Sequence, residues 1–127
     1  MLVYADPAAA IDFLCAAFGF EVAFRMDGPD GEVGHAELRL GGEYGAAVTL
    51  ASPWREASLV PPDELPGLHS QIGIELDDAS DVDAHYERAR AAGAVVVGEP
   101  TDQEYGIRSY RAIDPEGNRW YIGGPIG

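Results

Sequence analysis

Three histidines are the side chains of this sequence best suited to metal or proton-transfer chemistry. His35 and Glu37 stand two positions apart in an alternating segment, so one strand face would present both to a divalent cation. Arg39 follows on the same face, which favours a solvated polar stripe over a metal site. His69 precedes another predicted strand, and a change of register could bring it inward. His85 falls in a predicted helix, where we expect a packing or surface residue.

Other catalytic patterns are missing from the sequence. Cys15 is the only cysteine, which excludes an internal disulfide and a thiolate metal cluster. Because it stands in the helical phase of Ile11, Leu14 and Phe18, we interpret it as a packing thiol rather than a nucleophile. No serine, histidine and acid stand with nucleophile-elbow spacing, and GGEYG is a hairpin turn rather than a phosphate-binding loop.

The composition is that of a single globular domain with an acidic surface. The chain has 127 residues, 46% of them hydrophobic, and a formal net charge of -14 at pH 7. Nucleic acid and anionic membranes would repel such a protein, so we expect neither as a partner, whereas a cationic ligand would be favoured. The same charge also serves solubility alone. No apolar run could cross a bilayer and the N-terminus lacks a signal-peptide pattern, so the expected location is the cytoplasm.

The predicted elements follow the order strand, helix and three strands, and this order then repeats. Asp6 and Pro7 are typical of a helix start and Gly19 of its end, which predicts a helix between them. Alternation and turn residues predict strands at 2–5, 20–26, 32–40 and 44–51, then, after a proline-rich segment, a strand at 71–76, a helix over 77–93 and strands at 94–100, 107–113 and 118–123.

Corresponding residues of the two halves lie at a nearly constant separation along the chain. A helix-start aspartate, a helix-end glycine and a turn glycine recur 71, 74 and 72 positions later; the pairs are Asp6 and Asp77, Gly19 and Gly93, and Gly45 and Gly117. This repeat predicts an α+β fold of two βαβββ modules, at 1–51 and 69–127, joined by a linker or flap at 52–68. Neither module could bury enough surface alone, so each should pack against another module of the same chain or of a second chain.

The sequence resembles a known superfamily in three places. The string YGIRSYRAIDPEGNRWYI, the opening DPAAAIDFL…FGF and the second-helix ending AAGA are similar to the glyoxalase, bleomycin-resistance and dioxygenase superfamily, also called the vicinal oxygen chelate fold. The resemblance extends over nearly the whole chain. It implies that each module curls into a half-barrel with a ligand cavity on its concave face, and that two chains form a homodimer with two cavities.

The metal ligands of the catalytic relatives are not matched in this sequence. The resemblance places them at the start of the first strand and near the middle of the last strand of each module, usually as His or Glu. Gln71 and Tyr121 stand there in the second module and Thr49 in the first, and the remaining position would precede Met1. Because an amide, a phenol and a hydroxyl are poor ligands for Zn, Ni or Fe, we expect no metal, no cofactor and no catalytic residue.

Strand alternation predicts which side chains would line a metal-free cavity. In QIGIEL the apolar residues should face the helices, leaving Gln71 and Glu75 to the cavity. In NRWYI, Trp120 should face the helices and Tyr121 the cavity. The expected lining is aromatic and polar, and consists of Tyr4, Phe24, Thr49, Trp54, Gln71, Glu75, Tyr105, Arg108, Tyr110 and Tyr121.

Three of these residues have a second interpretation. Phe24 is favoured as a core residue, as aromatic side chains usually are. Trp54 lies outside any apolar face, so it is either a lid over the cavity or an anchor in a dimer contact. Arg108 could bind an anionic group of a ligand, but an ion pair with Glu75, Glu104 or another carboxylate is favoured.

The leading hypothesis is a metal-free protein that binds a small molecule, of the drug-resistance or carrier type. Aromatic faces beside a carboxylate such as Glu75 suit a planar or cationic compound, through stacking and cation–π attraction. One alternative is a lyase, isomerase or dioxygenase with a displaced metal site at His69, His35 and Glu37. The other is a non-catalytic scaffold whose cavity is filled by side chains.

Overall fold

The computed structural model describes residues 1–42 and 45–127, and its elements follow the order predicted from the sequence. The first half contains β1 (Leu2–Val3), α1 (Pro7–Phe18), β2 (Glu21–Asp27), β3 (Val33–Leu40) and β4 (Ala46–Ala51); the second contains β5 (Ile72–Glu75), α2 (Val82–Ala91), β6 (Val95–Asp102), β7 (Ile107–Ile113) and β8 (Arg119–Pro125). Three 3-10 turns accompany them, η1 (Arg55–Ala57), η2 (Pro62–Glu64) and η3 (Ala79–Asp81). Tyr44, the first residue of a predicted strand, lies outside the described residues.

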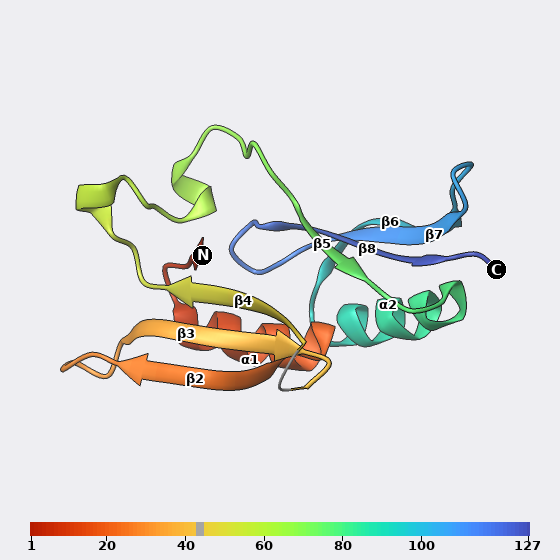
Figure 1. Cartoon of the computed structure of the whole chain (residues 1–127). Helices are drawn as coiled ribbons and strands as arrows, with labels where there is room; N and C mark the ends of the chain where they lie inside the picture. The colour runs from red at the N-terminus through yellow and green to blue at the C-terminus, as the bar shows by residue number, and fades with distance from the viewer. Residues whose placement is uncertain (43–44) are drawn as a thin grey trace.

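The strands form two sheets of the same topology. Their orders are β1-β4-β3-β2 and β5-β8-β7-β6. The pairs β1–β4 and β5–β8 are parallel, and all the other neighbouring strands are antiparallel. The sheets lie side by side without forming a closed barrel, and the segment 52–71 arches above them (Figure 1). The predicted α+β fold with two βαβββ units is therefore confirmed.

Helix α1 begins and ends where its local signals predict. The Asp6 carboxylate accepts a hydrogen bond from the amide of Ala9 at 3.1 Å, and Pro7 occupies the first helical position, where an amide hydrogen would have no partner. Gly19 ends the helix with φ of 79°, a left-handed conformation that glycine adopts at little cost. No helix among the described residues is long and apolar enough to span a membrane.

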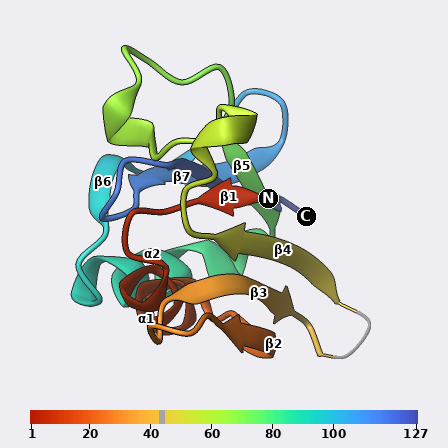
Figure 2. The same ribbon diagram turned by 90° about the vertical axis from the view of Figure 1, so that its left-hand side faces the viewer.

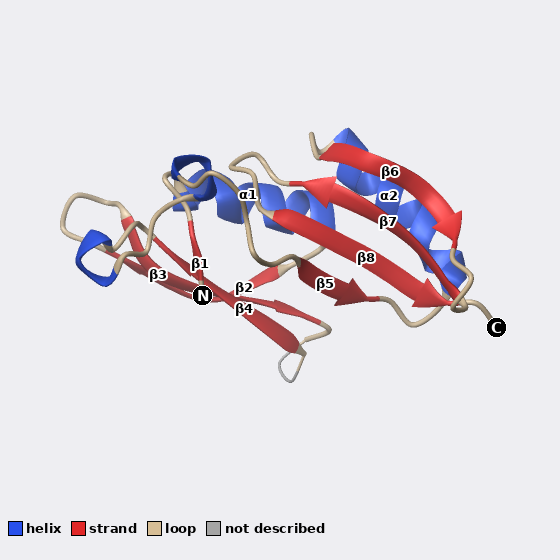
Figure 3. Ribbon diagram, turned by 90° about the horizontal axis from the view of Figure 1, so that it is seen from above, coloured by secondary structure: helices blue, strands red, loops and turns tan. Residues whose placement is uncertain are grey.

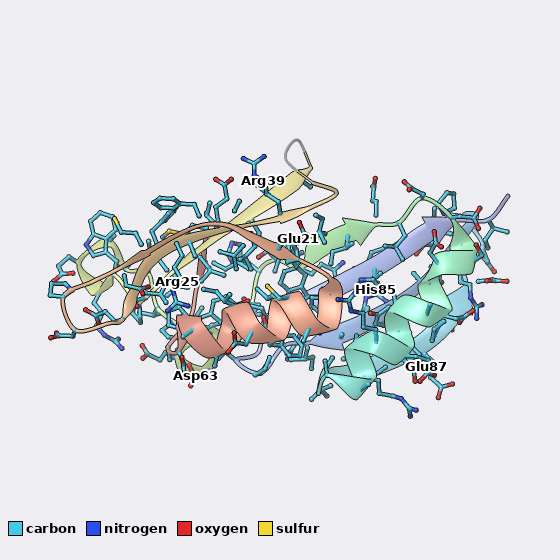
Figure 4. The ribbon with its side chains drawn as sticks, turned by 90° about the horizontal axis from the view of Figure 1, so that it is seen from below. Glu21, Arg25, Arg39, Asp63, His85 and Glu87 are labelled. Carbon is cyan, nitrogen blue, oxygen red and sulfur yellow. The ribbon has the colours of Figure 1, made fainter. Side chains whose placement is uncertain are left out.

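The two halves share one apolar core that lies between the helices and the sheets. In Figures 2 and 3 the helices lie on one side of the sheets, with α2 beneath the strands of the second sheet. The ring of Phe18, at the end of α1, lies 5.0 Å from that of Trp120 on β8 and 5.8 Å from that of His85 on α2. Figure 4 shows His85 at this junction of the helices. The Arg88 guanidinium adds hydrogen bonds to the Cys15 and Ala16 carbonyls at the C-terminal end of α1.

A buried carboxylate forms a second connection between the halves. Asp114 accepts hydrogen bonds through Oδ2 from the Tyr4 hydroxyl at 2.7 Å and from Trp120 Nε1 at 3.0 Å. The neighbouring Glu116 carboxylate accepts from the backbone amides of Ala5 and Asp6, at 2.5 and 2.8 Å, just before α1. The expectation that Tyr4 lines a cavity is therefore wrong. Its side chain is fully buried, and its hydroxyl donates a hydrogen bond to Asp114 in the other half of the chain.

Candidate ligand-binding face

The face of the second sheet that is turned away from α2 carries three of the predicted lining residues, Glu75, Tyr105 and Tyr121, and we call it the open face. The strand register places Gly73, Tyr121, Arg111 and Gly98 in one row across β5, β8, β7 and β6. Their neighbours along the strands, such as Trp120, Ile122 and Ile74, are buried on the helix side. The alternation predicted for β5 and β8 is therefore confirmed.

Tyr121 stands at the centre of this face among glycines. A Cβ built on Gly73 or Gly98 would meet nothing within 4 Å, so the space above these positions is open. A Cβ on Gly123 would instead lie 3.3 Å from the Tyr121 ring and 2.8 Å from Ile107 Cγ2. Glycine at that position lets the phenol ring and the isoleucine approach the backbone.

Two tyrosines and an arginine meet on the open face. The hydroxyl oxygens of Tyr105 and Tyr121 lie 3.1 Å apart, within hydrogen-bond distance, and Tyr105 reaches Tyr121 from the turn between β6 and β7. This hydrogen bond raises the pKa of Tyr105 above its usual value, so the Tyr105 phenol is neutral at physiological pH. The guanidinium carbon of Arg111 lies 5.1 Å from the centre of the Tyr121 ring, a cation–π distance.

Tyr121 lines one cavity, and its neighbour Arg111 lines another. One of about 530 Å³ is lined by Tyr121, Glu75 and Ile107 together with Gly123, Gly124 and Pro125. A smaller one of about 230 Å³ is lined by Arg111 and Glu99 together with Gln103 and Ser109, and Gln103 Nε2 donates to Ser109 Oγ at 3.2 Å. Space for a small molecule therefore exists beside Tyr121, with the Glu75 carboxylate in its lining, and a smaller space exists beside the Arg111 guanidinium.

Two predicted lining residues lie on the opposite side of the second sheet. Tyr110 is buried in the core, where its hydroxyl lies 2.7 Å from His85 Nδ1 and its ring packs on Tyr86. Arg108 projects towards α2 and pairs with Asp83 and Asp102, each at 2.9 Å. The expected placement of Tyr110 and Arg108 in the cavity is therefore wrong, whereas the structural ion pair favoured for Arg108 is present, with partners other than those named.

The first sheet presents a polar stripe on its own outer face. Glu37 of β3 lies between Phe24 of β2 and Thr49 of β4, and its carboxylate pairs with Arg39 at 2.6 Å. Phe24 is 52% exposed, so its interpretation as a core residue is wrong. The ring of Phe24 lies 6.3 Å from that of His35. This face resembles the open face in its mixture of aromatic and charged groups.

The linker has defined local structure. Arg55 and Glu64 form a bidentate ion pair with two contacts of 2.7 Å that joins η1 to η2. Trp54, just before η1, is 58% exposed and borders a cavity of about 410 Å³ that Met1 also lines. Its large exposed ring is available for either of the roles considered, a lid or a contact with another chain.

The residues at the family's metal-ligand positions do not fit a divalent cation. Gln71 immediately precedes β5, Tyr121 is hydrogen-bonded to another phenol, and Thr49 lies on the other sheet. Within residues 1–42 and 45–127, no three His, Cys, Asp or Glu side chains are grouped so as to hold a metal ion. The structure does not bring His69, at the end of the linker, together with His35 and Glu37, as the displaced site would require.

Arg111 is the candidate that sequence reasoning missed. The segment 107–113 alternates between Ile, Ser, Arg and Ile on one side and Arg, Tyr and Ala on the other, so neither side is clearly apolar. The register shows which side of β7 faces the core, because Ala112 pairs with Trp120 and Tyr110 pairs with Ile122. Both partners are buried core residues. Applying the alternation predicted for β8 to the antiparallel neighbour would have identified Arg111 as a residue of the open face.

The fold is that of a class of proteins with paired βαβββ units and two sheets that do not close into a barrel. The family model for the Glyoxalase/Bleomycin resistance protein/Dioxygenase superfamily matches residues 1–122. The chain belongs to this superfamily.

Similar proteins support the same assignment. An uncharacterised protein of Mycobacterium bovis is 36% identical over 125 residues, which are 98% of this chain and 80% of that protein. The crystal structure of TioX from Micromonospora sp. ML1 is 31% identical, covers 98% of this chain and 94% of its own, and superposes with a TM-score of 0.73. A superfamily enzyme from Burkholderia phytofirmans, with 23% identity, 98% and 94% coverage and a TM-score of 0.76, shares the fold.

Proposed function

We propose that this protein binds a planar aromatic small molecule on the open face, without a metal ion or other cofactor, and that it sequesters or carries this compound. The observation that carries the proposal is Tyr121, a half-buried side chain that lines a cavity of about 530 Å³ and is hydrogen-bonded to the exposed Tyr105. Phenol rings attract flat ligands by stacking, and a rigid strand holds Tyr121 in place. The donor set at the family's metal positions, an amide, a phenol and a hydroxyl, favours binding over metal-dependent catalysis.

A cationic group on the ligand is the expectation from the sequence. Glu75 supports it, because this carboxylate lines the same cavity as Tyr121 and has no ion pair with another described residue. The net charge of -14 would also raise the local concentration of a cation near the protein.

We further propose that the protein acts in the cytoplasm as a homodimer of chains with modules at 1–51 and 69–127. The outer strands β2 and β6 support the dimer, because both are sheet edges with exposed apolar side chains. These side chains, 48% to 60% exposed, are Val22, Phe24, Met26, Val95 and Val97. A symmetric contact with a second chain would cover these side chains, and the resemblance to the superfamily implies that the same contact completes the cavity.

The binding proposal is tested by thermal shift with a panel of planar aromatic compounds, each measured on protein purified without an affinity tag. Tyr121→Leu is the test variant and Tyr86→Leu, on α2, the matched control. Each variant is compared with its own ligand-free Tm. We expect at least one compound to raise the Tm of the wild type and of Tyr86→Leu, and to lose most of this effect in Tyr121→Leu.

Metal content tests the other half of the proposal. The same preparation is measured by mass spectrometry before and after incubation with Zn, Ni, Mn and Fe(II), and we expect far less than one metal per chain. Near-stoichiometric metal that is lost in His69→Ala would refute the metal-free proposal. A panel without any hit, or hits that persist unchanged in Tyr121→Leu, would refute binding at this face.

A further inference from the structure

The arginines of this lysine-free chain differ in their partners. Five form ion pairs with aspartate or glutamate side chains, namely Arg25, Arg39, Arg55, Arg90 and Arg108. Arg88 donates to backbone carbonyls at the end of α1. The remaining two, Arg111 and Arg119, form no ion pair with a described residue, although the chain has 22 acidic residues to 8 basic ones.

Both of these arginines project from the open face. Arg111 lies opposite Tyr121 in the register of β7 and β8, and Arg119 lies opposite Ile113, two residues further along the same strands. The Arg111 guanidinium lies over the Tyr121 ring, while Arg119 Nη1 donates to the Gly117 carbonyl at 3.0 Å. Both side chains are exposed, so their remaining N–H groups are open to a molecule from outside.

We propose that the ligand of the open face carries a carboxylate or another anionic group, which Arg111 binds while the aromatic part of the ligand lies against Tyr121. This inference rests on the proposed function and specifies the class of ligand. The Arg111 guanidinium lies over the Tyr121 ring at a cation–π distance, which uses none of its N–H groups, and the edge of a guanidinium can offer two parallel N–H groups to a carboxylate. Arg119 adds positive charge to the same face.

The space around Arg111 suits such a ligand. A Cβ added to Gly98, beside Arg111 in the row, would meet no atom within 4 Å, and Gly73 is equally open on the far side of Tyr121. A flat ring can therefore cross Tyr121 with its anionic end over β7. Glu75 lies in the cavity on the opposite side, so the same ligand can carry a cationic group at its other end.

The overall acidity of the protein does not exclude an anionic ligand. Charges separated by more than about 8 Å are largely screened at physiological ionic strength. The net charge of -14 therefore lowers the rate of encounter, whereas the contact with Arg111 decides the affinity once the ligand is bound.

The test uses three naphthalene probes of similar shape and different charge: 2-naphthoate, 2-naphthamide and 2-naphthylmethylammonium. Their Kd values are measured by titration calorimetry, at one ionic strength, with the wild type, Arg111→Gln and Arg90→Gln. Arg90→Gln is the matched control because Arg90 pairs with Glu87 on the surface of α2. We expect the wild type and Arg90→Gln to bind naphthoate about tenfold more tightly than naphthamide. Arg111→Gln should reduce this preference to about twofold or less.

Each other outcome overturns the inference. Equal Kd values for naphthoate and naphthamide in the wild type would show that no cation recognises the ligand. A preference for naphthoate that persists in Arg111→Gln would place the anion elsewhere. Tightest binding of the ammonium probe, weakened by Glu75→Gln, would reverse the sign of the charge but leave the proposed function standing. Failure of all three probes, with hits in the aromatic panel, would refute only this inference, whereas failure in both would refute the proposed function as well.

Discussion

Replacing Tyr4 by Phe removes one hydroxyl from the buried junction between the two halves and should lower the stability of the whole fold. The hydroxyl donates to Asp114 Oδ2 at 2.7 Å, and the two residues are 0% and 3% exposed. Burial, then the Asp114 charge, raises the pKa of Tyr4 far above its usual value, so the phenol keeps the proton that it donates. A buried hydrogen bond to a charged group contributes about 1.5–3 kcal/mol, because the carboxylate left behind cannot recover a water molecule.

We therefore expect Tyr4→Phe to lose about 2 kcal/mol of the free energy of unfolding. With an unfolding entropy of about 2.1 cal/mol/K per residue over 127 residues, this corresponds to a decrease in Tm of roughly 7 °C. Urea denaturation followed by circular dichroism measures the loss. Tyr105→Phe is the control, because that hydroxyl lies on an exposed side chain and its removal should cost less than about 0.5 kcal/mol. A Tyr4→Phe variant as stable as this control would refute the assigned role of the hydrogen bond.

Three further predictions concern the junction and helix α1. Burial lowers the pKa of His85 below its usual value, so the histidine of the unfolded chain is protonated first as the pH falls below about 6.5. Stability should therefore decrease with falling pH by at most about 1.4 kcal/mol per pH unit. Urea midpoints at pH 7.5 and 5.5 should show a smaller decrease in His85→Gln than in the wild type. Gly19→Ala should cost about 1–2 kcal/mol because φ is 79°, whereas Gly67→Ala, in open space, should be nearly neutral by the same measurement. Glu116→Ala should cost about 0.5–1.5 kcal/mol, because two exposed amides before α1 exchange a charged acceptor for water. Equal stability of Glu116→Ala and the surface control Glu87→Ala would contradict this.

Local signals were sufficient to predict the elements and one part of the face. The Asp6 cap and the Gly19 end of α1 depend on a few neighbouring residues, and both are found where the sequence places them. The side-chain directions in β8 were predictable because one side of the strand, with Trp120 and Ile122, is plainly apolar and the other is not. A repeat of βαβββ order then predicts the sheets, since each half must pair its strands in the same way.

The errors have a common physical cause, which is that contacts distant in the sequence determined the outcome. Tyr4 is buried against Asp114, which stands 110 positions later in the chain, so no neighbouring residue in the sequence indicates its burial. Tyr110 and Arg108 turn towards α2 because the register with β8 sets the direction of β7, and the segment itself is polar on both sides. Phe24 is exposed because it lies on the outer face of the first sheet, in the edge strand β2. Propensity and alternation alone contain none of this information.

The two faces of β8 provide a way to separate stability from binding. Trp120 lies on the core face of β8 and donates a hydrogen bond to Asp114. Tyr121, the next residue, lies on the open face beside Arg111. Because successive side chains of a strand point in opposite directions, a change on one face should leave the other in place. Tyr4→Phe should therefore lower the free energy of unfolding while preserving the preference for naphthoate over naphthamide. Arg111→Gln should have the opposite profile, with the Tm unchanged and the preference lost.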